Sequence, residues 1–415
     1  MAKTDLIVGL DVGSGKMTAI AAAHDRETNT LKVLTGRSII CRGLKGGVVS
    51  DIGETSTAVN ALLGSIQREC AQNIGQLFVG VRGSHLASFS SHGSYNVSGP
   101  DTEIGQEDMD MAVENAKSVQ IKSDTEIVSV LPQGYFVDKQ PVANPEGMEG
   151  KNLEVDVQIV TGASTHLRNL AKSIQRPGYH VDGKCYGIIA LAEAVLTQDE
   201  KENGAMILDF GGETISVGLY IGGLLKFSCD IPYGCDVITS DLSRFLRTPS
   251  KSAREIKETY GAAHPDFLRE DVSIDVPLLD GSSTRSIKAS EIVDIIQVRM
   301  EELLEQVERR SIAYGFKPQT LPLVGVITGG GSQMPGLPLL CMSILGLKEV
   351  RRGTVQRDLI NSDEEFFAPQ YSTAMALTIY SSDGSPYDEV YNSSYSSGGS
   401  MFERVGKFFK SIFGN

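Results

Sequence analysis

The chain has 415 residues, 41% of them apolar, and a formal net charge of −14. That length allows two ordinary domains with their own cores, and so acidic a body argues against a nucleic-acid partner. No apolar run reaches the eighteen or so residues that a membrane span needs, so we expect any membrane contact to be peripheral. The six cysteines lack C-x-x-C spacing and no signal peptide is seen, which predicts a reducing, cytoplasmic location.

Three segments share one pattern, an apolar strand followed by a glycine-rich turn. They are residues 6–23, 205–223 and 321–340. In the first two, an aspartate (Asp11 or Asp209) lies at the strand end and a second strand follows the turn. Because these two segments start about 200 residues apart, the sequence predicts an α/β fold with a duplicated βββαβα-type domain.

Helical periodicity follows these segments at 53–72, 187–197, 236–247 and 290–312. In the last of these, apolar residues recur at helix spacing. Ser290 is the expected N-cap of that helix, because its hydroxyl can accept a hydrogen bond from a free backbone N–H group.

Residues 84–161 interrupt the pattern. The first part, 84–99, predicts a strand and a turn, 105–120 predicts a helix, and the remainder predicts two or three strands around a Pro/Gly loop. We therefore expect a small α+β subdomain inserted into the first half. Near the other end, residues 381–400 hold eight serines and three glycines, a composition typical of a flexible linker.

The first glycine-rich turn, "GLDVGSGK", has the chemistry of a phosphate site. Gly13, Ser14 and Gly15 let backbone N–H groups approach a phosphate without an intervening Cβ atom. Asp11 is placed to hold Mg²⁺ through water, and Lys16 can neutralise phosphate charge. The P-loop and dinucleotide-binding spacings are absent. For this turn alone, a glycine-rich β-hairpin without a ligand remains the alternative.

Two further turns complete a nucleotide cradle. In the second, "LDFGGETISVGL", Asp209 lies at the strand end, and the turn and a hydroxyl ligand come from Gly211, Gly212 and Thr214. The third, "ITGGGSQMPGL", offers close approach to a nucleoside and a soft face for a purine, through Gly329, Gly330, Gly331 and Met334. The first two hairpins would hold a polyphosphate from both sides, with Asp11 and Asp209 sharing one Mg²⁺.

The order "DVGSGK", "DFGGET", "TGGGSQMPG" resembles the phosphate-1, phosphate-2 and adenosine motifs of the actin/DnaK/hexokinase ATPase superfamily. Within it, the whole chain resembles the FtsA family of bacterial cell-division proteins, through "RGLKGGVVSDI" at 42–52, "YSTAMAL" at 371–377 and the C-terminal tail. The resemblance implies a two-lobed actin-like ATPase fold that binds ATP and Mg²⁺ between the lobes. It also implies adenine-side contacts from Lys257 and Glu258 in "REIKETYG".

The resemblance further implies a division into domains, in which the insert replaces the usual actin insertion. The expected parts are a first lobe at 1–83, the inserted α+β subdomain at 84–161, a return to the first lobe and interlobe connection at 162–203, a second lobe at 204–380 with an outer subdomain at 240–290, a linker at 381–400, and an amphipathic helix at 401–415.

One residue departs from the superfamily pattern. Glu213 follows the two glycines of the second turn, where a small residue is common. Its carboxylate would repel a γ-phosphate unless Mg²⁺ or Lys16 offset it; the alternative is that it points to solvent. No other residue is marked as a water-activating base, so we assign no catalytic residue and expect weak or no ATPase activity.

The last segment, "SMFERVGKFFKSIFGN" at 400–415, is amphipathic as a helix. At about 100° per residue, its apolar side chains fall within an arc of roughly 140°; they are Met401, Phe402, Val405, Phe408, Phe409, Ile412 and Phe413. The basic residues of the segment are Arg404, Lys407 and Lys410. Spacing alone allows a helix docked on the protein's own core. The family resemblance favours an anchor lying in the plane of an anionic membrane.

The expected function is that of an ATP-binding, self-assembling adaptor. By the family resemblance, it would tether a ring of the tubulin-like FtsZ to the cytoplasmic face of the inner membrane at the division site, and help recruit later division proteins. Its expected partners are FtsZ, further copies of itself, anionic lipid and those division proteins. Two alternatives share the ATP cradle. A small-molecule kinase would need a catalytic aspartate over a substrate hydroxyl, and a pilus-assembly adaptor should lack the terminal helix.

Overall fold

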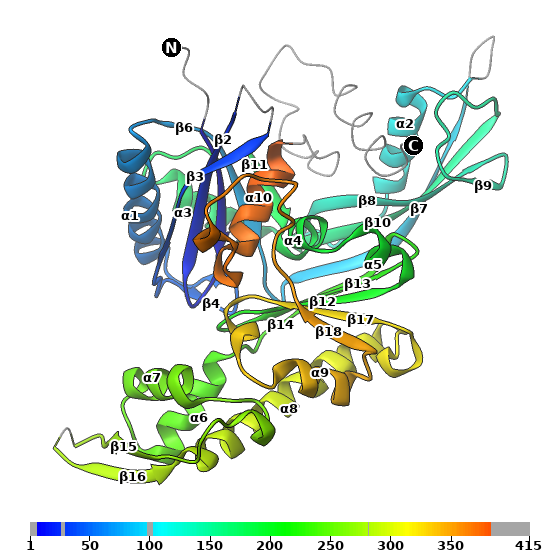
Figure 1. The fold of residues 1–415 in the computed structure, drawn as a ribbon. Helices are drawn as coiled ribbons and strands as arrows, with labels where there is room; N and C mark the ends of the chain where they lie inside the picture. The colour runs from blue at the N-terminus through cyan, green and yellow to red at the C-terminus, as the bar shows by residue number, and fades with distance from the viewer. Residues whose placement is uncertain (1–5, 26–29, 98–102, 281, 383–415) are drawn as a thin grey trace.

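Two five-stranded sheets form the centres of two lobes in the computed structural model, which describes residues 6–25, 30–97, 103–280 and 282–382 (Figure 1). In each sheet an antiparallel three-strand meander is followed by two strands parallel to its first strand. The first sheet has the order β11-β6-β1-β2-β3, with β1 at Leu6–Val12, β2 at Met17–His24, β3 at Leu31–Ile39, β6 at Ile74–Val81 and β11 at Gly183–Tyr186. The second has the order β14-β13-β12-β17-β18, with β12 at Ala205–Phe210, β13 at Ile215–Ile221, β14 at Leu224–Ile231, β17 at Val324–Thr328 and β18 at Glu349–Arg352. The predicted duplication is confirmed.

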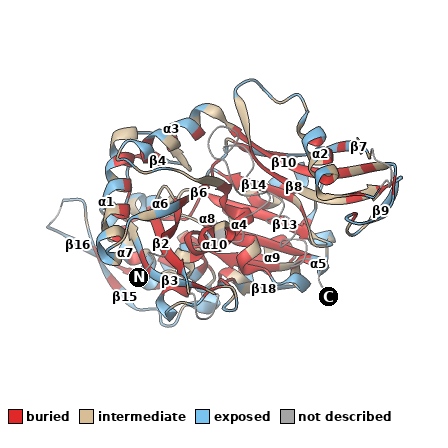
Figure 2. Cartoon of the chain, turned by 90° about the horizontal axis from the view of Figure 1, so that it is seen from above, coloured by how far each residue is buried: buried red, intermediate tan, exposed pale blue. Residues whose placement is uncertain are grey.

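Helices cover both faces of each sheet, which is why the central strands are continuous apolar runs without polar alternation (Figure 2). On the first lobe they are α1 at Ile52–Cys70, α3 at Ser164–Gln175, α4 at Gly187–Val195 and α10 at Ser372–Ser382. The second lobe carries α5 at Gln198–Asn203, α6 at Asp236–Leu246, α7 at Ser250–Tyr260, α8 at Ala289–Ala313 and α9 at Leu337–Leu345.

The predicted helix starts are right to within a residue or two, but the predicted cap of α8 is wrong. Lys288 is the N-cap, and its N–H group donates to the side chain of Glu291, 3.1 Å away. Ser290 lies inside the first turn, where its N–H group donates to the carboxylate of Asp271 at 3.0 Å. A carboxylate from the preceding loop thus takes the capping role that the sequence suggested for a serine hydroxyl.

Helices α4 and α10 pack together at the centre of the molecule (Figure 1). α4 is buried along almost its whole length, and its Ile188 belongs to the same core cluster as Ile207 of the second sheet. The "YSTAMAL" segment lies at the start of α10, where Ala374 contacts β1 so closely that a Cβ atom at Gly9 would collide with its carbonyl group. Small residues on both sides therefore allow α10 to lie against the strand that carries Asp11.

Residues 86–163 form a separate four-stranded sheet with the order β7-β10-β8-β9 and one helix against it (Figure 1). The elements are β7 at Leu86–Asn96, α2 at Gln106–Lys117, β8 at Thr125–Val137, β9 at Gln140–Val142 and β10 at Asn152–Ala163. Their buried side chains make a core cluster of their own, which the predicted α+β insertion requires.

The remaining described strands form two hairpins, β4 (Leu44–Lys45) with β5 (Val48–Val49) and β15 (Ser273–Pro277) with β16 (Thr284–Lys288). The second hairpin, with α6 and α7, forms the outer end of the second lobe (Figure 1). Helix α10 continues through Ser382, so residues 381 and 382 belong to a helix and not to the predicted linker. The rest of that linker and the predicted amphipathic helix at 401–415 lie outside the described residues.

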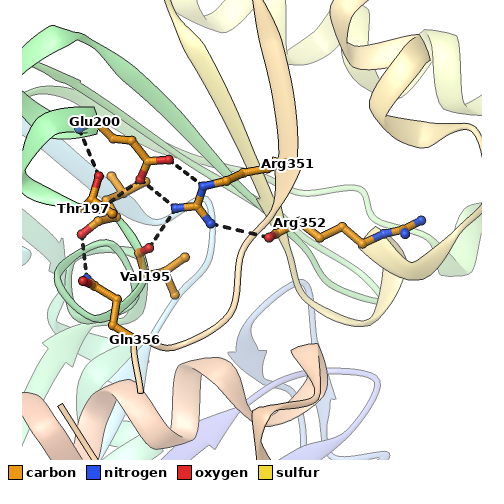
Figure 3. A network of polar contacts seen from close by, with 7 residues as sticks. Val195, Thr197, Glu200, Arg351, Arg352 and Gln356 are labelled. Atoms are coloured by element: carbon orange, nitrogen blue, oxygen red, sulfur yellow. Dashed lines mark hydrogen bonds and ion pairs between the residues drawn. The ribbon is translucent and has the colours of Figure 1, made fainter. Parts of the chain in front are cut away.

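A polar network ties the connection between the lobes to the edge of the second sheet (Figure 3). The guanidinium of Arg351 in β18 donates to both carboxylate oxygens of Glu200, at 2.5 and 2.6 Å, and to the carbonyl of Val195 at 3.0 Å. Glu200 also caps α5 by accepting from the N–H of Thr197 at 2.8 Å. Burial acts to raise the pKa of Glu200, but the hydrogen bonds from Arg351 and Thr197 outweigh it and lower that pKa.

Replacing Arg351 with alanine should therefore destabilise the fold. The carboxylate of Glu200, only 15% exposed, loses its bidentate partner, which we expect to lower the free energy of unfolding by about 2 kcal/mol. The matched control is Arg309→Ala, which breaks an exposed pair with Glu305 on α8 and should cost no more than about 0.5 kcal/mol. Urea unfolding followed by circular dichroism measures both; equal costs would contradict this role for Arg351.

Candidate functional site

A cavity of about 520 Å³ lies between the two lobes, at the strand ends that carry the glycine-rich turns. Every residue that the sequence predicted for the nucleotide site lines it: Asp11, Gly13, Ser14, Gly15, Lys16, Asp209, Gly211, Gly212, Thr214, Lys257, Glu258, Gly329, Gly330 and Met334. Residues more than 300 positions apart in the chain therefore meet at one surface.

The two hairpin turns approach each other closely, and both line this cavity. A Cβ atom built on Gly15, in the β1–β2 turn, would lie only 3.7 Å from the Cα atom of Gly212 in the β12–β13 turn. Within its own turn, Gly13 has room for no side chain, because a Cβ atom there would lie 2.6 Å from the carbonyl oxygen of Lys16. Both turns thus expose backbone without side chains, which is the requirement for close approach to phosphate oxygens.

The second turn is held from below by the start of α6. The carbonyl of Gly211 accepts from the N–H of Cys235 at 2.9 Å, and the carbonyl of Gly212 accepts from the N–H of Asp236 at 2.7 Å. Two carbonyl groups of the turn are thereby bonded to the start of α6. This fixes the orientation of the turn before any ligand binds, which lowers the cost of binding.

The third turn closes the cavity over Asp209. Gly329 has φ = 79°, in the left-handed region, and a Cβ atom there would collide with the carboxylate of Asp209. Met334 is 8% exposed and forms part of the wall. Gly330 is exposed, and a Cβ atom on it would meet nothing within 4 Å. Space for a flat group therefore exists beside Gly330.

The opposite wall comes from α7. Lys257 donates from its ammonium group to the carbonyl of Cys235 at 3.1 Å, and Arg254 pairs with Asp236 at 3.2 Å. Glu258 lines the same wall and is exposed. The short match that suggested Lys257 and Glu258 thus identified cavity residues, while Arg254 and Asp236, which the sequence analysis missed, lie beside them.

The main residue missed is Arg82, which follows β6 and lies at the floor of the cavity. Its Nη2 atom is 2.7 Å from Oδ1 of Asp11 and 3.3 Å from Oδ2 of Asp209, and its side chain is only 7% exposed. One guanidinium thus joins a carboxylate of the first lobe to a carboxylate of the second. A charged residue directly after the buried strand "QLFVGV" was the available signal, because β6 is parallel to β1 and ends at the same edge of the sheet.

Electrostatics keeps this arginine charged. Burial acts to lower the pKa of Arg82, but the nearby carboxylates of Asp11, Asp209 and Asp230 raise it far above its ordinary value. Burial also raises the pKa of Asp11, although Arg82 opposes that effect, and it raises the pKa of Asp230. Asp230 accepts from the N–H of Gly83 at 2.5 Å, so a second carboxylate of the second lobe binds the same segment of the first.

The pair Asp11 and Asp209 does not fit the shared Mg²⁺ that the sequence suggested. Carboxylate oxygens are suitable ligands for that ion, but one oxygen of Asp11 accepts a hydrogen bond from Arg82, and one oxygen of Asp209 forms an ion pair with the same guanidinium. Within the described residues, no cluster of three or more His, Cys, Asp or Glu side chains has the geometry of a metal site. A cation does lie between these carboxylates, and it belongs to the protein.

Glu213 takes neither of its two expected orientations. Its Oε2 atom accepts from the N–H of Gly46 at 2.6 Å, at the tip of the β4–β5 hairpin of the first lobe. At the same tip, the N–H of Gly47 donates to the hydroxyl of Ser14 at 2.8 Å. The expected choice between solvent and the γ-phosphate is thus corrected, because Glu213 connects the second lobe to the "KGG" tip of the first.

Solved structures similar to this chain define its class. A chain of the PilM–PilN type IV pilus biogenesis complex matches with a TM-score of 0.63 at 16% identity, over 90% of this chain and 97% of that one. MreB5 of Spiroplasma citri bound to AMPPNP matches at 0.53 and 12% identity, over 92% and 97%. The MamK double helical filament matches at 0.53 and 13%, over 91% and 99%. The protein has the actin-like ATPase fold.

Sequence comparisons assign the protein to one family within this fold class. The family model "SHS2 domain inserted in FTSA" matches residues 83–161, and "Cell division protein FtsA" matches residues 206–376. The cell division protein FtsA of Neisseria meningitidis serogroup B is 32% identical over 369 residues, which is 89% of this chain and 88% of that protein. The Pseudomonas aeruginosa protein of the same name is 32% identical over 399 residues, 94% of each chain. The chain belongs to the FtsA family.

Removing the carboxylate of Glu213 should free the tip of the β4–β5 hairpin. In Glu213→Ala the N–H of Gly46 loses a charged acceptor worth about 1.5 kcal/mol, so its amide hydrogen should exchange about tenfold faster. Glu213→Gln keeps a carbonyl acceptor at the same position and is the matched control, with exchange close to wild type. Hydrogen exchange of the peptide spanning 42–52, read by mass spectrometry, measures this. Identical exchange in all three proteins would show that the contact contributes nothing in solution.

Proposed function

We propose that the cavity between the lobes binds ATP. The observation that carries the proposal is the approach of the two glycine turns, Gly13–Gly15 and Gly211–Gly212, from opposite lobes. A polyphosphate lying along both turns would accept hydrogen bonds from backbone N–H groups of each lobe, and a cavity of about 520 Å³ has the size of common ligand sites. The similarity to MreB5, whose structure holds AMPPNP, supports the same site.

Four cationic side chains that could contact phosphate line the cavity together with five carboxylates. Lys16 is exposed at the turn of the first hairpin, and Lys257 and Arg254 line the wall of α7. Adenosine would then occupy the space beside Gly330 and Met334. This arrangement matches the roles that the superfamily resemblance assigned to the three turns.

We further propose that hydrolysis is weak or absent. A base for water activation needs a free carboxylate beside the phosphate cradle. Of the five carboxylates that line the cavity, four are engaged, and the fifth, Glu258, lies on the α7 wall. Asp11 and Asp209 bind Arg82, Glu213 binds the N–H of Gly46, and Asp236 pairs with Arg254. The same engagement argues against a small-molecule kinase, which would need a catalytic aspartate over a substrate hydroxyl.

The biological role that we propose is in cell division, as an adaptor that ties the FtsZ ring to the membrane. Membership of the FtsA family supports the division role. We assign the FtsZ contact to the outer end of the second lobe, where Phe245 and Leu279 are exposed by 67% and 69%. Self-assembly is supported by the family and by the filament described for the similar MamK protein. Later division proteins would join through the same adaptor.

The C-terminal segment 401–415 is the proposed membrane anchor, placing the protein at the cytoplasmic face of the inner membrane. Within the described ranges, no helix is long and apolar enough to cross a bilayer. Seven apolar side chains on one arc contribute about 1 kcal/mol each at an interface, and three basic residues add about 1 kcal/mol each near anionic lipid. The entropy cost of ordering the segment offsets much of this binding free energy. An assembly that displays many tails would therefore bind far more tightly than one copy.

ATP binding is tested most simply by filling the adenosine space. Gly330→Leu places a branched side chain there without a backbone clash, because a Cβ atom meets nothing within 4 Å. We expect ATP affinity to fall at least about tenfold. Gly134→Leu is the matched control, since Gly134 has equally open surroundings but lies in β8 of the insert. Isothermal titration with ATP decides; if Gly330→Leu binds as wild type does, adenosine lies elsewhere.

The membrane anchor is tested with single charges in the apolar arc. Phe408→Glu should release the protein from anionic vesicles. Burying one carboxylate costs a few kcal/mol, which exceeds the small net free energy of membrane binding that we expect for one tail. Lys407→Glu, one position away on the polar side, should weaken binding less and mainly at low salt. Vesicle flotation measures both variants. If Phe408→Glu floats like wild type and the body unfolds at a lower temperature, the tail is docked on its own protein.

A further inference from the structure

We propose that Arg82 is a built-in cation of the phosphate site, so that this chain binds nucleotide without needing a divalent metal ion. The inference rests on the proposed ATP binding in the cavity between the lobes. It concerns how the charge between Asp11 and Asp209 is balanced, and it is carried by the position of one buried side chain.

The guanidinium occupies the place between the two carboxylates. Nη2 of Arg82 donates a hydrogen bond to Asp11 at 2.7 Å and forms an ion pair with Asp209 at 3.3 Å. These three side chains are 7%, 14% and 7% exposed for Arg82, Asp11 and Asp209, respectively, so water screens the contact little. A divalent ion bound by both carboxylates would first have to displace a buried guanidinium from both of them.

Electrostatic repulsion from Arg82 disfavours a metal ion at this position. A metal ion added beside the guanidinium would meet a like charge at close range in a poorly screened site, where such repulsion is strong. An arginine keeps its charge under all ordinary conditions, and here the neighbouring carboxylates raise its pKa further. The site therefore always holds one positive charge, fixed to β6.

The rest of the guanidinium is available to a phosphate. A Cβ atom built on Gly211 would lie 3.6 Å from Nη1 of Arg82, so this nitrogen lies next to the phosphate-2 turn. The Nε atom is buried and has no hydrogen-bond partner within the described structure. Arginine binds phosphate through its N–H groups, and Arg82 is one of the residues that line the cavity. One side chain can thus bind both carboxylates with one nitrogen and face the phosphates with another.

The experiment is a titration of the full-length chain with ATP, once with saturating Mg²⁺ and once with excess EDTA. Wild type should bind with affinities that differ by less than about threefold between the two conditions. Arg82→Gln, which removes the charge but keeps a polar side chain, should lose at least about tenfold in EDTA and regain affinity with Mg²⁺. Arg254→Gln removes a charge from the same cavity without touching Asp11 or Asp209. It should weaken binding equally in both conditions.

A second measurement needs no nucleotide. Titration with Mn²⁺ alone, followed by electron paramagnetic resonance, should show no stoichiometric site in wild type and a new one in Arg82→Gln.

If wild type binds ATP only with Mg²⁺, or binds Mn²⁺ stoichiometrically by itself, the inference is overturned and Arg82 only links the two lobes. If wild type binds no ATP in either condition but also no Mn²⁺, the proposed function fails while the protection of the carboxylates by Arg82 stands. If Arg82→Gln does not fold, the two wild-type titrations still decide.

Discussion

The buried bridge from Asp11 through Arg82 to Asp209 is the interaction on which the geometry of the cavity depends. It is the point where the central strand of one sheet is joined by charge to the central strand of the other. Without the guanidinium, two carboxylates from opposite lobes would face each other in a buried site and repel. With it, the strand ends are held at the separation that brings the two glycine turns face to face.

Contacts around this bridge reinforce the same closure. Asp230 of the second lobe accepts from the N–H of Gly83, one residue beyond Arg82. Glu213 reaches from the second turn to the N–H of Gly46 in the first lobe. Further out, Arg351 ties β18 to the connection between α4 and α5. The segment after β6 leads directly into the insert, whose first strand begins at Leu86, so the phosphate site and the insert share one short stretch of backbone.

The sequence predicted well what local patterns encode. Asp11 and Asp209 at the ends of apolar strands, each followed by glycines, identified both hairpins, and all fourteen predicted nucleotide residues line one cavity. It failed where a role depends on distant pairing. Arg82 gains its function from the parallel pairing of β6 with β1 and from the approach of a second lobe, and Glu213 binds a backbone N–H 167 positions away. Ser290 was taken for a cap because the competing carboxylate of Asp271 lies nineteen residues earlier.

The buried bridge and the two turns together imply that nucleotide binds against both turns while Arg82 stays in place. A crystal structure of the full chain with a non-hydrolysable ATP analogue tests it directly. We expect phosphates against Gly13–Gly15 and Gly211–Gly212, with the guanidinium still between Asp11 and Asp209. A nucleotide bound elsewhere, or a metal ion between the two carboxylates with Arg82 turned away, would contradict it.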